Sequence, residues 1–260
     1  MTEALPPLDA LLVDLDGVLY VEDEPVEGAV EAVRELRDSG LTLRFVTNTT
    51  ARSHDQTVDK LARLGFEVSS EELVTPAALA RQHCVDAGHQ EVALIMNENV
   101  KEDFGGLEES EDSPGAVIMG DLGERFGFAI LNSAFRMVMD GAELIALQKN
   151  RFWLTADGLS LDAGPFVAAI EFASGREALV VGKPSEAFFR LVLEGAGATP
   201  ERAAIIGDDV ETDVGGAIDA GLAGILVRTG KYREDFVRQS GIEPTATLDS
   251  IADLPGAFEG

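Results

Sequence analysis

Cysteine is almost absent from this chain, which has one, Cys84, in 260 residues. A single thiol excludes an internal disulfide, and the sequence around it does not resemble a zinc-ligand spacing. Basic residues are also scarce: 20 Lys plus Arg stand against 47 Asp plus Glu, a formal net charge of −27. A field of this sign repels polyanions, so we do not expect nucleic acid as a partner.

Lysine is the scarcer of the two basic residues, and the acids are spread along the chain instead of forming a tail. Such a distribution coats the whole surface with negative charge. The composition resembles that of proteins from a high-salt cytoplasm, and we expect a halophilic protein. An ordinary acidic protein is the alternative.

Long apolar runs are missing as well, since no stretch approaches the ~20 residues that span a bilayer. The first ten residues, MTEALPPLDA, carry acids and no basic segment of the kind that begins a secretion signal. We therefore expect a cytoplasmic protein with no membrane partner. Hydrophobic residues make up 45% of the chain, which is typical of a globular domain.

Short apolar runs alternate with helical patterns along most of the chain. In residues 27–40, Val30, Val33 and Leu36 recur at helical spacing before Gly40, and residues 55–66 repeat this pattern. The alternation predicts an α/β fold with a Rossmann-like parallel sheet. The segments interpreted as strands are ALLVDL, LTLRFVT, EVALIMN, GAVIMG, ELIAL, EALVVG, AAIIGD and AGILVRT.

One segment departs from this alternation. In RFWLTADGLSLDAG, Phe152 and Leu154 precede Asp157-Gly158, and Leu159 and Leu161 follow. Alternating apolar residues around an Asp-Gly pair predict a β-hairpin.

Small polar sites follow four of the predicted strands, and ligands bind at that edge of open parallel sheets. Carboxylates that converge there repel each other unless a cation lies among them, and Mg²⁺ prefers such oxygen ligands. Neutral donors and a lysine would add a binding site for an anion. A metal ion, an anion site and a free carboxylate nucleophile are the groups that phosphoryl transfer needs. The sites are Asp14 with Asp16, Thr47 with Asn48, Lys183, and Asp208 with Asp209 and Asp213.

The pair in LLVDLDGVLY is the first of these sites. Asp14 and Asp16 lie two residues apart on an extended chain and so address the same face, and Gly17 lets the backbone turn close to a ligand. Alone, a DxDG could equally be a strand-ending turn. The other three sites favour the catalytic interpretation.

The stretches DLDGVLY, FVTNTT, VVGKPS and IIGDDVETDVGGA resemble, in order, the four motifs of the haloacid dehalogenase (HAD) superfamily phosphatases. The variants DLDGVLY and TNTT are similar to subfamily IIA, which contains 4-nitrophenyl phosphatases, nucleotide monophosphatases and phospholysine/phosphohistidine/pyrophosphate phosphatases. The resemblance implies a Mg-dependent phosphatase of small phosphorylated metabolites that works through an aspartyl-phosphate.

By position, the resemblance implies that Asp14 is the nucleophile and Asp16 the general acid and base. Mg²⁺ would be held by the Asp14 carboxylate, the Asp16 carbonyl and Asp208, with Asp213 in a supporting role.

The remaining motif residues would handle the phosphate: Thr47 and Asn48 would bind its oxygens, and Lys183 would neutralise charge on nucleophile and phosphate. Two plainer interpretations stay open, because Thr47-Asn48 are also good helix caps and Lys183 could be a surface residue before a proline. Asp209 is left out of the site as a loop acid.

The 135 positions from Asn48 to Lys183 far exceed the ~30 residues of a βαβ unit, so an inserted domain is expected. We place the catalytic core at residues 1–78 and 180–260 and an inserted α/β cap, of the C2 type by resemblance, at residues 79–179. In the cap, Asp121 is a weak candidate for the site, because Gly-Asp after a strand is usually a turn. Similar proteins often dimerise through the cap, which makes a homodimer an expectation here.

Two other functions remain open. A HAD-type phosphomutase would use the same aspartyl-phosphate but return the phosphoryl group to a second hydroxyl. A phospho-receiver would also combine acids, a Thr and a Lys around Mg²⁺, but in one domain of ~120 residues without a cap.

Overall fold

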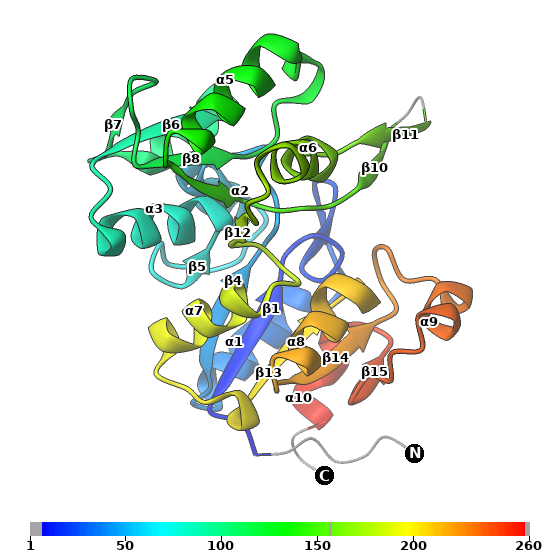
Figure 1. Cartoon of the computed structure of the whole chain (residues 1–260). Helices are drawn as coiled ribbons and strands as arrows, with labels where there is room; N and C mark the ends of the chain where they lie inside the picture. The colour runs from blue at the N-terminus through cyan, green and yellow to red at the C-terminus, as the bar shows by residue number, and fades with distance from the viewer. Residues whose placement is uncertain (1–6, 156–157, 258–260) are drawn as a thin grey trace. The chain divides into compact units, whose positions relative to one another are not determined.

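The chain forms two compact units in the structure, a computed structural model that describes residues 7–155 and 158–257 (Figure 1). The first unit consists of Met1–Thr47, Thr57–Val74 and Lys183–Gly260. The second unit consists of Asn48–Gln56 and Thr75–Gly182. Each unit has a parallel sheet of its own, so each is described separately.

The sheet of the first unit has six parallel strands in the order β15-β14-β13-β1-β4-β5. The chain builds outward from β1 on one side and then returns to build outward from β13 on the other. The carboxyl ends of β1 and β13 therefore flank the point where the strand order reverses, which is where such sheets bind ligands. The strands are β1 (Ala10–Asp14), β4 (Thr42–Val46), β5 (Leu73–Val74), β13 (Ala203–Gly207), β14 (Ala223–Val227) and β15 (Ala246–Leu248).

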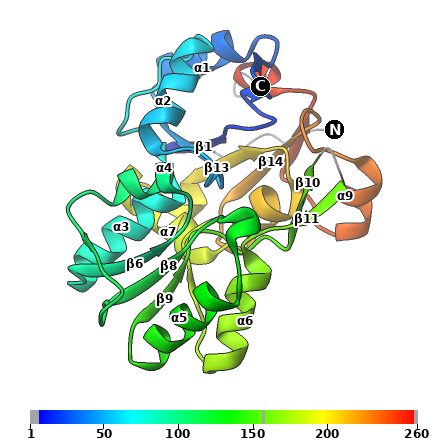
Figure 2. The same ribbon diagram turned by 90° about the horizontal axis from the view of Figure 1, so that it is seen from above.

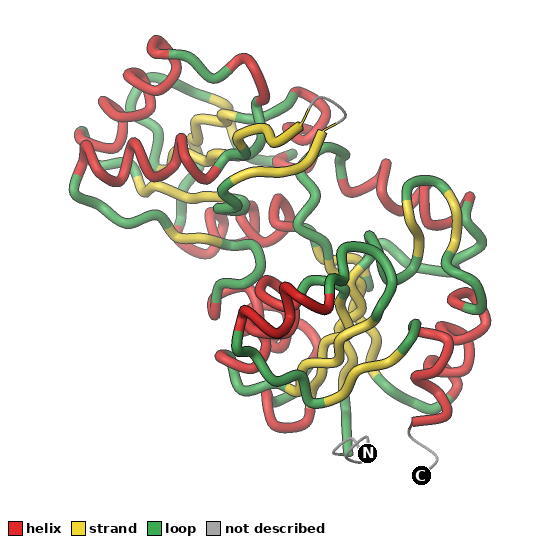
Figure 3. Tube along the Cα trace, turned by 90° about the vertical axis from the view of Figure 1, so that its right-hand side faces the viewer, coloured by secondary structure: helices red, strands yellow, loops and turns green. Residues whose placement is uncertain are grey.

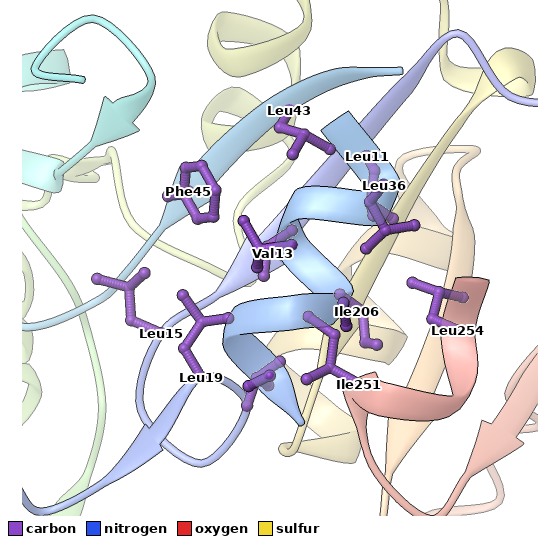
Figure 4. Close-up of a cluster of buried hydrophobic side chains, with 14 of the residues drawn as sticks. Leu11, Val13, Leu15, Leu19, Leu36, Leu43, Phe45, Ile206, Ile251 and Leu254 are labelled. Carbon is purple, nitrogen blue, oxygen red and sulfur yellow. The ribbon is translucent and has the colours of Figure 1, made fainter. Parts of the chain in front are cut away.

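Helices cover this sheet because successive residues of its buried strands point to opposite faces. Leu11 and Val13 of β1 belong to a core that includes Leu36 of α1 and Leu254 of α10 (Figure 4). On the other face, Leu226 packs with residues of the segment that follows β13. The helices with residues in this unit are α1 (Ala29–Asp38), α2 (His54–Arg63), α7 (Glu186–Ala196), α8 (Gly216–Asp219), α9 (Glu234–Ser240) and α10 (Leu254–Ala257); a π-helical segment (Val210–Gly215) precedes α8.

A small hairpin follows the DxDG turn, formed by β2 (Tyr20–Val21) and β3 (Glu24–Pro25). Lys60 of α2 is buried against it, with Nζ 4.0 Å from the centre of the Tyr20 ring and 2.6 Å from the Glu22 carbonyl oxygen. A buried ammonium needs such partners because it has left water.

The second unit has a five-stranded parallel sheet in the order β12-β9-β8-β6-β7, and Figure 2 shows β6, β8 and β9 side by side. Helices α5 and α6 pack on one face of the sheet and α3 on the other. The strands are β6 (Glu91–Ile95), β7 (Glu108–Glu109), β8 (Ala116–Met119), β9 (Glu143–Ala146) and β12 (Leu179–Val180), and the helices are α3 (Pro76–Ala87), α4 (Glu98–Lys101), α5 (Phe128–Met139) and α6 (Gly164–Ser174).

The predicted hairpin is confirmed, since β10 (Phe152–Thr155) pairs antiparallel with β11 (Gly158–Leu161). Asp157, the first residue of the expected Asp-Gly turn, lies outside the described residues. The α/β class and all eight predicted strands are also confirmed, and the strands appear as yellow segments in Figure 3. Both edge strands of the first sheet, β5 and β15, were not predicted, because two or three residues carry no usable periodicity.

No helix among the described residues is long and apolar enough to cross a membrane.

Candidate active site

Asp14 is the last residue of β1 and is only 6% exposed. Its Oδ1 accepts a charge-assisted hydrogen bond from Lys183 Nζ at 2.5 Å. Burial raises the pKa of Asp14, and Lys183 opposes that shift. The carboxylate is therefore held at the strand end by a cation from a distant part of the sequence.

Lys183 lies between two acids, since its Nζ is also 2.6 Å from Asp213 Oδ1. All three side chains are buried. Burial disfavours the ammonium form, but the carboxylates of Asp14 and Asp213 outweigh it and raise the pKa of Lys183 above its ordinary value. The two carboxylates thus favour the charged form of Lys183, and its burial shows that the interpretation as a surface lysine is wrong.

Asp208 follows β13 and has two oxygens in different situations. Oδ2 accepts a hydrogen bond from the Lys231 backbone N–H at 2.7 Å. Oδ1 is buried and has no hydrogen-bond partner among the residues that the structure describes. Burial, with the nearby charges of Asp14 and Asp213, raises the pKa of Asp208 to about 7. A buried carboxylate oxygen without a donor is a candidate metal ligand.

Asp213 lies closer to the centre of the site than the sequence alone indicated. Its Oδ2 accepts a hydrogen bond from the Asp209 backbone N–H at 3.1 Å, and its side chain packs so tightly on Gly207 that a Cβ there would overlap it. Burial raises the pKa of Asp213 to about 6, although Lys183 opposes the shift. The glycine that ends β13 therefore makes room for this acid.

Asp14, Asp208 and Asp213 form a cluster in which each contributes one carboxylate oxygen within 4.8 Å of the others. Three buried carboxylates face one buried ammonium, Lys183, so the cluster carries excess negative charge. Like charges this close are stable only if protons or a cation neutralise them. The all-oxygen donor set and the unpartnered Asp208 Oδ1 fit a hard divalent metal ion.

Asp16 lies on the turn after β1 and is partly exposed. The Tyr20 hydroxyl donates a hydrogen bond to its Oδ2 at 3.3 Å. The negative charge of Asp16 adds to the effect of burial in raising the pKa of Asp14, so the two carboxyls act on each other. A partly exposed carboxyl beside the buried one suits an exchange of protons with a ligand and with water.

Thr47 and Asn48 fall in different units. Thr47 follows β4 and is buried in the first unit, whereas Asn48 begins the part of the chain assigned to the second unit. There its Oδ1 packs against Gly182. The helix-cap alternative is wrong for both, because α2 begins at His54 after a reciprocal pairing of Ser53 and Gln56.

The sequence did not indicate the loop after β14, where Lys231 binds Asp208 through its backbone. Its only signal is a Thr-Gly pair after a strand, which is common in turns.

Asp121 is held in a turn of the second unit: its Oδ1 accepts a hydrogen bond from the Gly123 N–H at 2.9 Å. The turn interpretation of Asp121 is therefore supported.

The strand order and the acidic cluster define a class of α/β proteins that gather carboxylates at the carboxyl ends of parallel strands, where they can hold a divalent metal. Family models agree: the haloacid dehalogenase-like hydrolase model matches residues 11–108, and a second, HAD-hydrolase-like model matches residues 180–254.

Two curated relatives cover almost the whole chain. Haloacid dehalogenase-like hydrolase domain-containing protein 2 of Homo sapiens is 44% identical over 94% of this chain and 93% of its own. Phospholysine phosphohistidine inorganic pyrophosphate phosphatase of Danio rerio is 36% identical over 96% of this chain and 94% of its own.

Solved structures of phosphatases share the fold. The p-nitrophenyl phosphatase from Archaeoglobus fulgidus has a TM-score of 0.89 at 26% identity, over 97% of this chain and 100% of that one. A glycerol phosphate phosphatase from Mycobacterium tuberculosis, in complex with magnesium, has a TM-score of 0.79 at 30% identity, over 95% and 76%. The chain belongs to the haloacid dehalogenase-like hydrolases, and it is a phosphatase of that family.

The raised pKa values of Asp208 and Asp213 predict how stability depends on pH without metal. An unfolded Asp titrates near ~4, so between about pH 4 and 7 the folded state binds more protons than the unfolded state, and the free energy of unfolding falls as pH rises. In EDTA we expect the thermal midpoint to drop by roughly 5–10 °C between about pH 5 and 8.

Saturating Mg²⁺ should remove most of this drop, because the metal replaces the protons. Asp208→Asn in EDTA should also flatten the profile, whereas Asp38→Asn, an exposed acid at the end of α1, should leave it unchanged. Thermal scans across this pH range measure all four cases. The same drop with and without Mg²⁺ would contradict the assignment of the metal to this cluster.

Proposed function

We propose that this phosphatase hydrolyses small phosphorylated metabolites with Mg²⁺ and that Asp14 carries the phosphoryl group as an aspartyl-phosphate. The observation that carries the proposal is the buried Asp14 carboxylate, with Oδ1 bound to Lys183 at 2.5 Å, beside the unpartnered Oδ1 of Asp208. One oxygen of the nucleophile is thereby oriented, and the other, Oδ2, is left for attack.

In the first step, Asp14 Oδ2 forms a bond to phosphorus while the bond from phosphorus to the leaving oxygen breaks. Asp16 donates a proton to that oxygen, so the alcohol leaves neutral. In the second step, Asp16 takes a proton from water, and the water oxygen displaces the Asp14 carboxylate from phosphorus. Tyr20, which donates to Asp16 Oδ2, keeps the carboxyl oriented through both steps.

The side chains of Asp14 and Asp208 and the backbone carbonyl of Asp16 are the proposed Mg²⁺ ligands. Bound Mg²⁺ would neutralise charge on the phosphoryl oxygens as it develops. Lys183 supplies the fixed positive charge of the protein itself, and Asp213 holds that ammonium in place at 2.6 Å. The magnesium-bound glycerol phosphate phosphatase supports this choice of metal.

Thr47 and Asn48 are the proposed donors to the phosphoryl oxygens, and the second unit is the proposed C2-type cap. The proposal takes residues 1–78 and 180–260 as the catalytic core and 79–179 as the inserted domain that contacts the leaving group; the second unit has wider bounds, Thr75–Gly182 with Asn48–Gln56. The curated and structural relatives support a small phosphorylated substrate, since their names include phospholysine, pyrophosphate, p-nitrophenyl phosphate and glycerol phosphate phosphatases. A screen that measures phosphate release from each of these substrate classes will identify the ones that this chain accepts.

Asp14→Asn should lower the hydrolysis of 4-nitrophenyl phosphate by roughly 10⁴-fold or more, because an amide oxygen is a poor nucleophile. Asp16→Asn should lower it by about 10²–10⁴-fold, the usual contribution of an acid-base group, and should let the phosphoenzyme accumulate. Release of 4-nitrophenol and mass spectrometry of the acid-quenched protein measure these effects.

Asp38→Asn is the control and should keep wild-type turnover. Full activity of the Asp14 variant would exclude it as the nucleophile, and activity in EDTA would contradict the metal site. A bisphosphate requirement would identify a phosphomutase instead, and stable phosphorylation without turnover would identify a receiver.

We also propose a homodimer formed through the second unit. Phe128 of α5 and Phe172 of α6 are 84% and 94% exposed, and the two helices pack together. Exposed aromatic side chains of this size favour burial in an interface.

Light scattering should give twice the chain mass for the wild-type protein and the single chain mass for Phe172→Glu. Phe236→Glu, at a half-exposed position in the first unit, is the control and should stay dimeric; a monomeric wild type would contradict the dimer.

We also propose that the protein is halophilic, because its net charge is −27. Self-repulsion of that charge destabilises the folded state and is screened by salt. We expect the thermal midpoint to rise by roughly 10 °C between about 0.1 and 2 M KCl, and much less in sucrose of equal osmolality, which screens nothing. A midpoint that is independent of KCl would contradict the proposal. The cytoplasmic location stays a prediction.

A further inference from the structure

Three backbone segments of the first unit meet around the Asp208 carboxylate. Gly17 belongs to the DxDG turn, Asp208 follows β13, and Gly230 lies in the loop after β14. A Cβ on Gly17 or on Gly230 would overlap Asp208 Oδ2, and a Cβ on Gly230 would also reach the Gly17 backbone. Both glycines have positive φ, 85° and 60°. Only glycine permits these two turns to close on the carboxylate.

Two hydrogen bonds join the same segments. The Lys231 backbone N–H donates to Asp208 Oδ2 at 2.7 Å, and the Thr229 hydroxyl donates to the Gly17 carbonyl oxygen at 2.5 Å. The first bond satisfies one oxygen of Asp208, while Oδ1 has no partner among the described residues. The loop after β14 thus distinguishes the two carboxylate oxygens.

We propose that Thr229, Gly230 and Lys231 form a positioning loop for the metal ligand Asp208. The loop fixes the rotation of the carboxylate so that Oδ1 points to the metal position, and through Thr229 it ties this ligand to the turn that follows Asp14 and Asp16. The inference rests on the proposed function, because it presumes a metal at Asp208. Groups that orient metal ligands in this way typically change metal affinity by about 10–100-fold when they are removed.

The side chain of Lys231 acts on the acids of the site through its charge, and this connection is weaker than the backbone hydrogen bond to Asp208. Its Nζ is 4.0 Å from Asp209 Oδ2, and the side chain is 70% exposed. A solvent-exposed pair of this kind contributes little. Lys231→Ala keeps the backbone N–H and should therefore keep the metal affinity within about threefold, well below the 10–100-fold change expected for lost orientation.

Gly230→Ala is the direct test, with Gly197→Ala as the matched control. Gly197, in the first unit, has a φ of 66°, close to that of Gly230, but a Cβ there would meet nothing within 4 Å. Both variants force alanine into the left-handed region, so both should lose thermal stability in EDTA. Only Gly230→Ala should weaken Mg²⁺ binding to the metal-free protein, by at least about tenfold in calorimetric titration.

Thr229→Val is the second variant, in case Gly230→Ala does not fold. It removes the hydroxyl that donates to Gly17 while keeping the shape, and we expect Mg²⁺ affinity to fall by about three- to tenfold; Thr229→Ser keeps the hydroxyl and should restore it. The 4-nitrophenyl phosphatase activity of the Gly230→Ala and Thr229→Val variants should recover at high Mg²⁺, because the nucleophile is unchanged.

The outcomes separate the two proposals. If wild-type protein does not bind Mg²⁺, the proposed function fails. If wild type binds Mg²⁺ and both Gly230→Ala and Thr229→Val bind it equally well, the metal site stands and the positioning loop is wrong. If Lys231→Ala weakens binding as much as Gly230→Ala does, the side chain and not the backbone orients Asp208, which also overturns the inference.

Discussion

The contact on which the site depends is a buried ammonium held between two buried carboxylates. Lys183 lies 2.5 Å from Asp14 and 2.6 Å from Asp213. The three residues come from the end of β1, the start of the last stretch of the first unit and the segment after β13, so the contact joins parts of the sequence more than 150 residues apart. Removing one partner of such a group leaves an unpaired charge away from water, which typically costs about 3–5 kcal/mol.

The fold brings these charged side chains together, and it leaves their negative charge only partly neutralised. Because β1 and β13 are neighbours in a parallel sheet, Asp14 and Asp208 reach the same edge without any long loop. Glycines then let the acids approach the backbone: Gly207 accommodates Asp213, and Gly17 accommodates Asp208. One lysine does not balance three carboxylates, and the remaining charge matches a divalent cation.

Much of this arrangement could be predicted from the sequence, because its signals are local. A short apolar run with an acid at its end indicates both the strand and the edge where the acid lies: Asp14 ends β1, and Asp208 directly follows β13. Edge strands β5 and β15 have too few residues for a periodic pattern. The role of Lys231 could not be predicted, since it binds Asp208 through a backbone N–H, and every residue except proline has one.

The position of Asp213 shows a second kind of limit. Its distance from Asp209 in the sequence indicates one turn of helix, and an exposed or a buried orientation of the side chain is compatible with that spacing. Two contacts favour the buried orientation of Asp213. Gly207 has no side chain and so leaves the space that Asp213 fills, and Lys183 neutralises the charge of Asp213 there. Both are tertiary contacts, so a residue to which the family resemblance gives a supporting role lies inside the buried cluster.

A phosphatase with a net charge of −27 must still bind a negatively charged phosphate. The two requirements are compatible because surface charges and site contacts act over different distances. Exposed charges act across water and are largely screened beyond ~8–10 Å at physiological salt. Lys183 acts within a few ångströms in a buried site, where the effective dielectric constant is lower and each contact is stronger. In the proposed mechanism, the surface field slows the approach of an anion at low salt, while the buried cation helps to hold the bound phosphate. High salt reduces the first effect far more than the second, so an acidic surface and a phosphate-binding site are compatible in one molecule.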